Sequence, residues 1–300
     1  MVGMRGKIPT KRLIQFIRCR SQPGPDIPHV QEFRRRNMLD FHILDVFTTG
    51  RPLSGNQLLV LEDRLDTLST EAMLSIAREI SFAESAFVRS DGVRIFTTDE
   101  EVPQAGHPVL GLAEVCAAGA DQITLRTQKG PINVRREGDR WVASQDPAEW
   151  HGAASSEQVA ALLERPGDAD EPVLVGATHP VGSTCGLPYA LVAVVSEAAL
   201  DALRLAPSAP QQQFSLYFFV RLSEREVRAR MFCYEGGGWI EDVATGSAAG
   251  PLAAHLAPCE LRVTQGGVRR AHLDVGAPTR TSRIDVGGAV ARVAMGQWAT

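Results

Sequence analysis

The chain has 300 residues and a mass of 32.4 kDa, long enough for two small domains or one large one. Its 44% of hydrophobic and 22% of charged residues exclude disorder along the whole chain. Its apolar runs are too short for a membrane-spanning helix, and a net charge of −4 excludes a chain built as a whole to neutralise nucleic-acid phosphates. Five cysteines without a C-x-x-C pair are typical of a reducing compartment, so we expect a cytoplasmic protein.

The charge of the chain changes abruptly near residue 38. Residues 1–37 hold nine Lys or Arg against two acidic residues, a net charge of +7, whereas the rest of the chain carries a net charge of −11. One interpretation is a basic arm for nucleic acid or acidic membranes. We favour the other, a disordered extension or a misassigned start, because Met38 directly precedes the first strand-like run.

From Met38 on, short apolar segments alternate with turns. Ser69 is a suitable N-cap for a helix in which Met73, Ala77 and Ile80 share one face. The run from Val109 to Ala118 is apolar on almost every side, which indicates a helix buried within the protein. The predicted strands of this half are residues 41–47, 57–61, 82–88 and 93–96.

The second half repeats the end of the first. A strand-like run ending at Phe232 is followed by a polar stretch, a turn at 245–247 and an apolar run at 248–257, in the order that also follows Phe96. A single repeat at an offset of 136 residues indicates a duplicated domain rather than a solenoid.

The domain boundaries follow from this repeat. We predict a basic extension at 1–37, an N-terminal domain at 38–150 and a C-terminal domain at 151–300; a return of the last strand to the N-terminal domain is left open. The linker is expected within 146–172. A short helix at 158–163 and a strand pair at 281–300 complete the prediction.

Each repeat places small residues at the start of its buried helix. Backbone N–H groups around Gly106 and His107, and around Gly246 and Ser247, then lack intrahelical acceptors. If the two helix starts face each other across a domain cleft, they form a seat for a small carboxylate.

The two helices differ in where they carry proline. Pro108 suits the first turn of its helix, where a missing N–H costs nothing. Pro251 requires either a helix that begins near Gly250 or a kink after a tight turn at 245–249.

Glu84 is the most informative single residue. It is the one charged residue between Ser81 and Val88, in a run otherwise made of Phe, Ala, Ser and Val. A carboxyl group on a largely buried strand is a candidate for proton transfer, because burial favours its neutral form. The ordinary alternative is a strand-end Glu that reaches solvent or pairs with an Arg, and the pattern favours neither.

His107 and Asp242 lie beside the two predicted anion seats. His107 is either an acid/base or substrate-binding group or a helix cap, and Asp242 is either a site carboxylate or a cap. By itself each residue is more often a cap, and their positions at the seats make them site candidates.

Other kinds of site find no support in the sequence. The seven histidines show no metal-ligand spacing, and no Walker or dinucleotide-binding glycine pattern occurs. The turn at 245–250 is not the G-x-S-x-G pattern of a nucleophilic serine. We therefore expect no metal site.

Several motifs, in order from Met38 to the C-terminus, resemble the PhzF-like proteins of phenazine biosynthesis, which are relatives of diaminopimelate epimerase. The last of these motifs is long enough to be highly specific. They are Leu39-Asp-Phe-His-Ile-Leu-Asp-Val-Phe47, Ser54-Gly-Asn56, Ala83-Glu-Ser85, Ala105-Gly-His-Pro108 and Glu241-Asp-Val-Ala-Thr-Gly-Ser-Ala-Ala-Gly-Pro251.

The resemblance implies an α+β fold of two similar domains, each a curled β-sheet around a central buried helix, with the active site in the interdomain cleft. It also implies a cofactor-independent isomerase that moves a proton on a small, carboxylate-bearing substrate. The implied assembly is a homodimer, and neither nucleic acid nor a membrane is expected as a partner.

The resemblance also implies roles for individual residues. Glu84 matches the proton-shuttling glutamate of the family, and His107 and Asp242 match its assisting pair. The residues that match its substrate-binding groups are Asn56, Gly106, Gly246 and Ser247.

The chain also departs from the family that it resembles and from the related epimerase. Ala105 and Thr245 stand where diaminopimelate epimerase has its two thiols, so two-cysteine epimerisation is excluded. Gln104 replaces an aromatic or apolar residue of many relatives, and the segment 265–272 lacks a Gly-Arg-Pro-Ser run. Two alternative functions remain: a non-catalytic binding protein that retains the cleft, and a one-base racemase or epimerase of an amino or hydroxy acid.

Overall fold

The computed structural model describes residues 38–51, 53–164, 174–184, 187–207, 213–235 and 237–299. The predicted extension at 1–37 lies outside the described residues, as do Cys19 and Cys185. Within the described ranges no helix is both long and apolar enough to cross a membrane.

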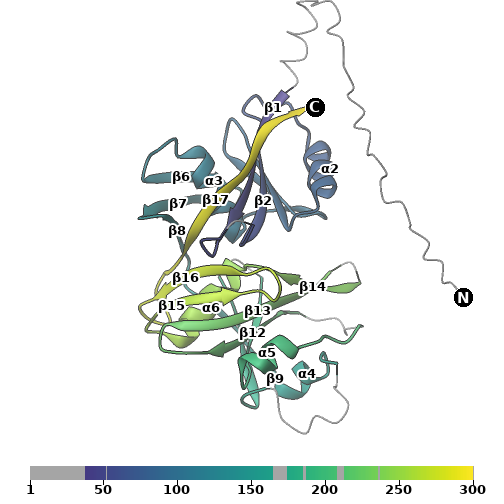
Figure 1. Ribbon diagram of the computed structural model, residues 1–300, viewed down its shortest axis with the longest axis vertical. Helices are drawn as coiled ribbons and strands as arrows, with labels where there is room; N and C mark the ends of the chain where they lie inside the picture. Colours follow the sequence, from purple (N-terminus) through teal and green to yellow (C-terminus); the bar gives the residue numbers. More distant parts are fainter. Residues whose placement is uncertain are drawn as a thin grey trace, which may run out of the picture. The chain divides into compact units, whose positions relative to one another are not determined.

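The N-terminal half of the structure consists of strands β1–β8 with helices α2 and α3 (Figure 1). β2 is antiparallel to β1 and parallel to β3, and β6, β7 and β8 form an antiparallel meander. The bounds are β1 Met38–Val46, β2 Asn56–Glu62, α2 Thr70–Ile80, β3 Glu84–Val88, β4 Val93–Phe96, β5 Glu101–Val102, α3 Gly106–Cys116, β6 Gln122–Thr127, β7 Gly130–Glu137 and β8 Arg140–Gln145.

The two helices of this half cover opposite faces of one sheet. Leu58 and Val60 of β2 belong to the core around α3, whereas Leu59 and Leu61 belong to the core under α2. This explains the continuous apolar run of β2, because both of its faces are buried. α3 contacts β2, β3, β6, β7 and β8, which confirms the predicted buried helix.

The N-cap of α2 is also as predicted. The Ser69 hydroxyl accepts a hydrogen bond from the Ala72 N–H, and Ser81 ends the helix in a left-handed conformation. β3 consequently begins at Glu84, two residues later than the predicted strand.

The C-terminal half has the same plan. α6 is the central helix and contacts β10, β11, β15 and β16, while α4 and α5 cover the outer face of the sheet. The bounds are β9 Glu149–Ser155, α4 Ser156–Ala160, β10 Thr178–Ser183, β11 Tyr189–Ala193, α5 Glu197–Ala202, β12 Ser215–Arg221, β13 Glu226–Glu235, β14 Gly238–Asp242, α6 Gly246–Leu256, β15 Cys259–Gln265 and β16 Ala271–Ala277. The fold is thus the predicted α+β arrangement of two similar halves.

Two local predictions in this half need correction. The linker helix lies at Ser156–Ala160 rather than 158–163, because Ser155 and Gln158 form a capping box that starts it earlier. α6 starts at Gly246 and runs through Pro251, so a helix that begins near Gly250 is wrong.

The predicted strand pair at the C-terminus is wrong, because residues Ile284–Ala299 form one strand, β17. It pairs with β16 and β8, and also with β1, and runs past both halves (Figure 1). Its two consecutive glycines are sites of close packing: a Cβ would lie 2.7 Å from Val142 Cγ2 at Gly287, and 2.4 Å from Phe47 Cδ1 at Gly288.

Candidate active site

The N-termini of the two central helices meet. A Cβ added to Gly106 of α3 would lie 3.4 Å from Gly246 Cα and 3.5 Å from the Ser247 backbone nitrogen of α6. The first N–H groups of a helix have no intrahelical acceptor, and here the N-cap residues Ala105 and Thr245 supply no side-chain acceptor either. The two predicted anion-binding helix N-termini therefore lie at a single site.

Glu84 lies beside this place, at the first residue of β3. Because β2 and β3 are parallel, they begin at the same edge of the sheet, and Glu84 pairs with Leu58 just after Asn56. The Glu84 side chain is 20% exposed, and its Oε2 lies 3.4 Å from His107 Nδ1. Glu84 is thus a strand-end residue, and its carboxyl group contacts His107; its part in proton transfer stays a prediction.

His107 is 3% exposed, and burial lowers its pKa to about 4 against the opposing influence of Asp242. Its Nε2 lies 3.2 Å from the Gln57 carbonyl oxygen, which can only accept. Nε2 of the neutral ring therefore carries the proton, and Nδ1 presents a lone pair towards Glu84.

Asp242, the last residue of β14, comes from the other half of the molecule. Asn56 Nδ2 donates to its Oδ1 at 2.8 Å, and the Thr245 hydroxyl donates to its Oδ2. Burial and the neighbouring charge of Glu84 raise the pKa of Asp242 to about 6, and the two hydrogen bonds act against that rise.

Asn56 connects the titratable groups. Its Nδ2 lies 3.4 Å from His107 Nδ1 and also donates to the Ala244 carbonyl at 3.3 Å, in addition to Asp242. One buried amide thus contacts both a residue of α3 and residues that precede α6. All seven predicted site residues lie at or next to the meeting helix N-termini.

Ser247 is held by residues that sequence reasoning missed. Its hydroxyl is 2.8 Å from Tyr189 Oη, and its carbonyl accepts from the Thr184 hydroxyl at 3.2 Å. The single proton of the Thr184 hydroxyl is shared between this carbonyl and Gln145 Oε1, which lies closer at 2.7 Å, so Thr184 also links the two halves. Pro251 was the available signal, because a proline inside a helix frees the carbonyl four residues earlier.

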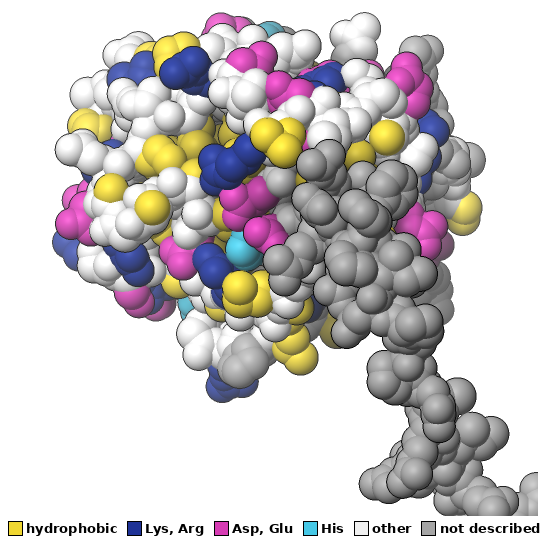
Figure 2. Space-filling view, turned by 90° about the horizontal axis from the view of Figure 1, so that it is seen from above, with side chains coloured by type: hydrophobic (Ala, Val, Ile, Leu, Met, Phe, Trp, Pro, Cys, Tyr) yellow, Lys and Arg dark blue, Asp and Glu magenta, His cyan; other side chains and the backbone are white. Residues whose placement is uncertain are grey.

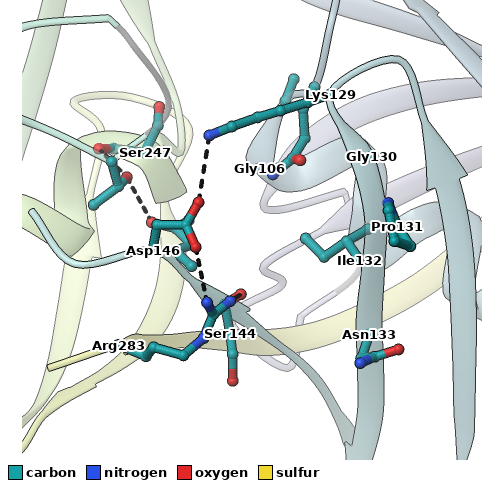
Figure 3. A pocket seen from close by; sticks show the side chains of 14 residues that line it. Gly106, Lys129, Gly130, Pro131, Ile132, Asn133, Ser144, Asp146, Ser247 and Arg283 are labelled. Atoms are coloured by element: carbon teal, nitrogen blue, oxygen red, sulfur yellow. Dashed lines mark hydrogen bonds and ion pairs between the residues drawn. The ribbon is translucent and has the colours of Figure 1, made fainter.

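A cavity of about 500 Å³ opens next to the two helix N-termini (Figure 3). Gly106 and Ser247 line it, whereas Glu84, His107 and Asp242 do not. Its remaining lining residues are mostly polar: Gln104, Ala105, Lys129, Gly130, Pro131, Ile132, Asn133, Ser144, Gln145, Asp146, Thr184 and Arg283. At one side Asp146 pairs with Lys129 at 3.7 Å and with Arg283 at 2.8 Å. Gln104, noted in the sequence as a departure, faces this space.

Among the described residues no group of three or more His, Cys, Asp or Glu side chains is arranged to hold a metal ion. The groups that the candidate site offers are instead one imidazole, two carboxyl groups and several N–H and O–H donors. Such a set can move protons and bind an anion.

Comparisons with known proteins place the chain in a family. The model of the PhzC-PhzF family, described as phenazine biosynthesis-like protein, matches residues 44–293. The trans-2,3-dihydro-3-hydroxyanthranilate isomerase of Pseudomonas aeruginosa is 37% identical over 234 residues, which cover 72% of this chain and 78% of that one. An uncharacterised isomerase of Mesorhizobium japonicum is 32% identical over 80% of this chain and 88% of that protein.

Solved structures are similar over most of the chain. A predicted epimerase from Pseudomonas aeruginosa has a TM-score of 0.71 at 31% identity and covers 87% of this chain and 99% of that one. A hydroxyproline epimerase from Agrobacterium vitis has a TM-score of 0.53 at 12% identity, covers 89% of this chain and 94% of that one, and shares the fold alone. With the family model spanning most of the described residues, the chain belongs to the phenazine biosynthesis-like PhzC-PhzF family.

Proposed function

We propose that the chain is an isomerase that moves a proton on a small, carboxylate-bearing substrate by general acid/base catalysis, without a cofactor. The observation that carries this proposal is the contact of Glu84 with His107 beside Asp242, at the meeting N-termini of α3 and α6. The relatives named as trans-2,3-dihydro-3-hydroxyanthranilate isomerases support the class of reaction.

In the proposed reaction Glu84 is the base. Its carboxylate takes a proton from an acidified carbon, so a C–H bond breaks and an O–H bond forms. The electron pair left on the substrate shifts a double bond, and Glu84 returns the proton to another carbon. Substrate and product then have the same composition, and no electron acceptor is needed.

His107 stabilises the state between the two transfers. Because its Nε2–H is directed at the Gln57 carbonyl, its Nδ1 lone pair is available to a protonated Glu84 3.4 Å away. The low pKa of His107 keeps the ring neutral, so the proton stays with Glu84 and remains available for return.

The donors of the two helix N-termini hold the substrate. Backbone N–H groups at Gly106, His107, Gly246 and Ser247 favour a carboxylate and negative charge that develops during proton removal. Asp242 accepts a hydrogen bond from a hydroxyl or amino group of the substrate. A polyanionic partner is not favoured by the face seen in Figure 2, on which basic and acidic side chains are interspersed. We further propose that the protein works as a homodimer in the cytoplasm.

Solvent deuterium exchange tests the proposal. The protein is incubated in D₂O with trans-2,3-dihydro-3-hydroxyanthranilate and with a set of small cyclic and amino carboxylates, and products are followed by NMR. An isomerase yields a rearranged product, which carries protium at the new carbon where Glu84 returns the proton that it removed and deuterium where that proton first exchanges with solvent. Deuterium at the original carbon with inverted configuration would instead indicate a racemase, and measurable binding with neither a rearranged product nor exchange would indicate a binding protein.

Glu84→Gln keeps the shape of the side chain and removes the base, so turnover should fall by about 10³-fold while ligand affinity, measured by calorimetry, is kept. Glu79→Gln, the same chemical change at an exposed position on α2, is the matched control and should leave turnover intact. Unchanged turnover in Glu84→Gln would rule out the assigned base.

A further inference from the structure

Gln265, the last residue of β15, is 0% exposed and lies behind the candidate active site. Its Oε1 accepts from the Thr245 N–H at 3.2 Å and from Tyr217 Oη at 3.0 Å. Its Nε2 donates to the Asp242 carbonyl at 3.0 Å and to Thr245 Oγ1 at 2.9 Å. The oxygen of this amide therefore accepts two hydrogen bonds, and its nitrogen donates two.

Two backbone groups fix which end of the amide points where. The Thr245 N–H can only donate and the Asp242 carbonyl can only accept. Turning the amide over would place an NH₂ group against the N–H and an oxygen against the carbonyl. The observed orientation of Gln265 is therefore the one that this backbone allows.

The orientation of the amide dictates the direction of the Thr245 hydroxyl. Since Thr245 Oγ1 accepts a hydrogen bond from Gln265 Nε2, the hydroxyl proton of Thr245 must point to another acceptor, and Asp242 Oδ2 is the acceptor within reach. We propose that Gln265 is a positioning residue of the candidate active site: its amide directs the Thr245 hydroxyl towards Asp242 Oδ2 and keeps that hydrogen bond in place. The catalytic meaning of this contact rests on the proposed function, whereas the contact itself does not.

The hydrogen bond from the Thr245 hydroxyl to Asp242 matters because opposing influences act on the pKa of Asp242. The titratable groups around it in the described residues are Glu84 on β3, His107 on α3 and Tyr217 on β12. Burial and Glu84 raise the pKa of Asp242, while the Thr245 hydroxyl and Asn56 lower it by favouring the ionised form. Gln265 thereby helps to keep Asp242 an ionised acceptor near neutral pH.

The test measures Asp242 directly, by carbon NMR titration of the aspartate carboxyl groups in the full chain, with Asp242→Asn used to assign the signal. Thr245→Val removes the hydroxyl at constant volume and should raise the pKa of Asp242 by about 1. Gln265→Met removes the amide and should shift it in the same direction. The double variant should show no larger change than Thr245→Val alone, because both substitutions remove one contact.

Two controls separate this role from general support of the fold. Thr245→Ser keeps the hydroxyl and should keep the pKa of Asp242 near that of the unmodified protein. Tyr217→Phe removes a partner of Gln265 at Oε1 and leaves Nε2 in place, so it should also leave Asp242 unchanged. Gln265→Leu is the second variant if Gln265→Met does not fold.

A Gln265 variant that folds and leaves the pKa of Asp242 unchanged would overturn the inference, as would an unchanged Asp242 in Thr245→Val. Neither result depends on turnover. A failure of the proposed isomerase activity would therefore be seen separately, as an Asp242 that responds as expected in a protein that forms no rearranged product.

Discussion

The two central helices start in similar ways and present different chemistry to the same place. Both begin with glycine after a residue that provides no side-chain cap. The start of α3 contributes an imidazole, His107, in contact with the Glu84 carboxyl group. The start of α6 contributes a hydroxyl group, Ser247, fixed by Tyr189.

Under the proposed function, this difference assigns different tasks to the two similar halves of the fold. The N-terminal half carries the groups between which a proton can move. The C-terminal half carries neutral donors and one carboxylate, Asp242, which Asn56 and Thr245 hold in place by hydrogen bonds.

The largest effect is expected on the pH dependence of stability. As the pH falls, His107 and Asp242 should change the free energy of unfolding in opposite directions. The pKa of His107 lies near 4 in the folded chain and near 6.5 when unfolded, so its contribution to stability is lost as the pH falls through that interval. The pKa of Asp242 lies near 6 in the folded chain and near 3.8 when unfolded, so its protonation stabilises the fold as the pH falls. In the unmodified protein the two contributions largely cancel.

Replacing His107 or Asp242 should make the contribution of the other residue to the pH dependence of stability visible. From pH 7 to pH 4, Asp242→Asn should lose up to about 3 kcal/mol of unfolding free energy, and His107→Gln should gain a similar amount from Asp242. Other titrating groups act equally on both variants, so the difference between the two urea-unfolding curves is diagnostic. Parallel pH dependences in the two variants would contradict the assigned environments.

The features of the fold that could be predicted from the sequence are those that depend on local patterns and on residues close together in the chain. The N-cap at Ser69 and the buried helix α3 follow from capping and periodicity, whereas the meeting of the two helix starts entered the sequence analysis only as a condition. The continuous strand β17 did not follow from such patterns, because the close contact of Gly288 with Phe47 joins residues far apart in the chain.

The contacts that support the site were missed for the same reason. Tyr189 with Ser247, and Gln265 with Tyr217, are pairs separated by 58 and 48 residues. Pattern reasoning finds which residues lie on a buried face and does not find which polar atoms meet there. The roles of the predicted site residues stay predictions, to be tested by the variants described here.

A second comparison is between two glycines of α3, Gly106 at its first position and Gly111 in its middle. Gly106→Ala would place a methyl group in ordinary contact with Gly246 and 3.5 Å from the Ser247 nitrogen, so the chain should fold while the N–H group is shielded. Ligand affinity should fall by about tenfold or more. Gly111→Ala would place its Cβ 2.4 Å from Leu58 Cδ2, which should cost about 1–3 kcal/mol of stability and leave ligand affinity unchanged.

Calorimetric titration with a bound carboxylate and urea unfolding measure both quantities on both variants. An equal loss of affinity in the two variants would show that the effect is not local to the helix N-terminus. An unchanged affinity in Gly106→Ala would remove that N-terminus from the binding site.

The smallest effect concerns the two prolines. Pro108 lies in the first turn of α3, where its missing N–H has no partner to lose, whereas Pro251 lies inside α6 and leaves the Ser247 carbonyl without its helical donor. The Thr184 hydroxyl, 3.2 Å away, takes that place. Thr184→Val should therefore cost about 1 kcal/mol.

Pro251→Ala restores an N–H at the position from which Ser247 would normally receive its hydrogen bond. In the Pro251→Ala chain, the stability loss caused by Thr184→Val should therefore be smaller by about 0.5 kcal/mol than in the unmodified chain. The loss that remains reflects the contact of Thr184 with Gln145. A double-mutant cycle by urea unfolding measures this difference. Strict additivity would mean that the Thr184 hydroxyl serves Gln145 alone, and that α6 tolerates an unpaired carbonyl at the very residue whose side chain lines the cavity.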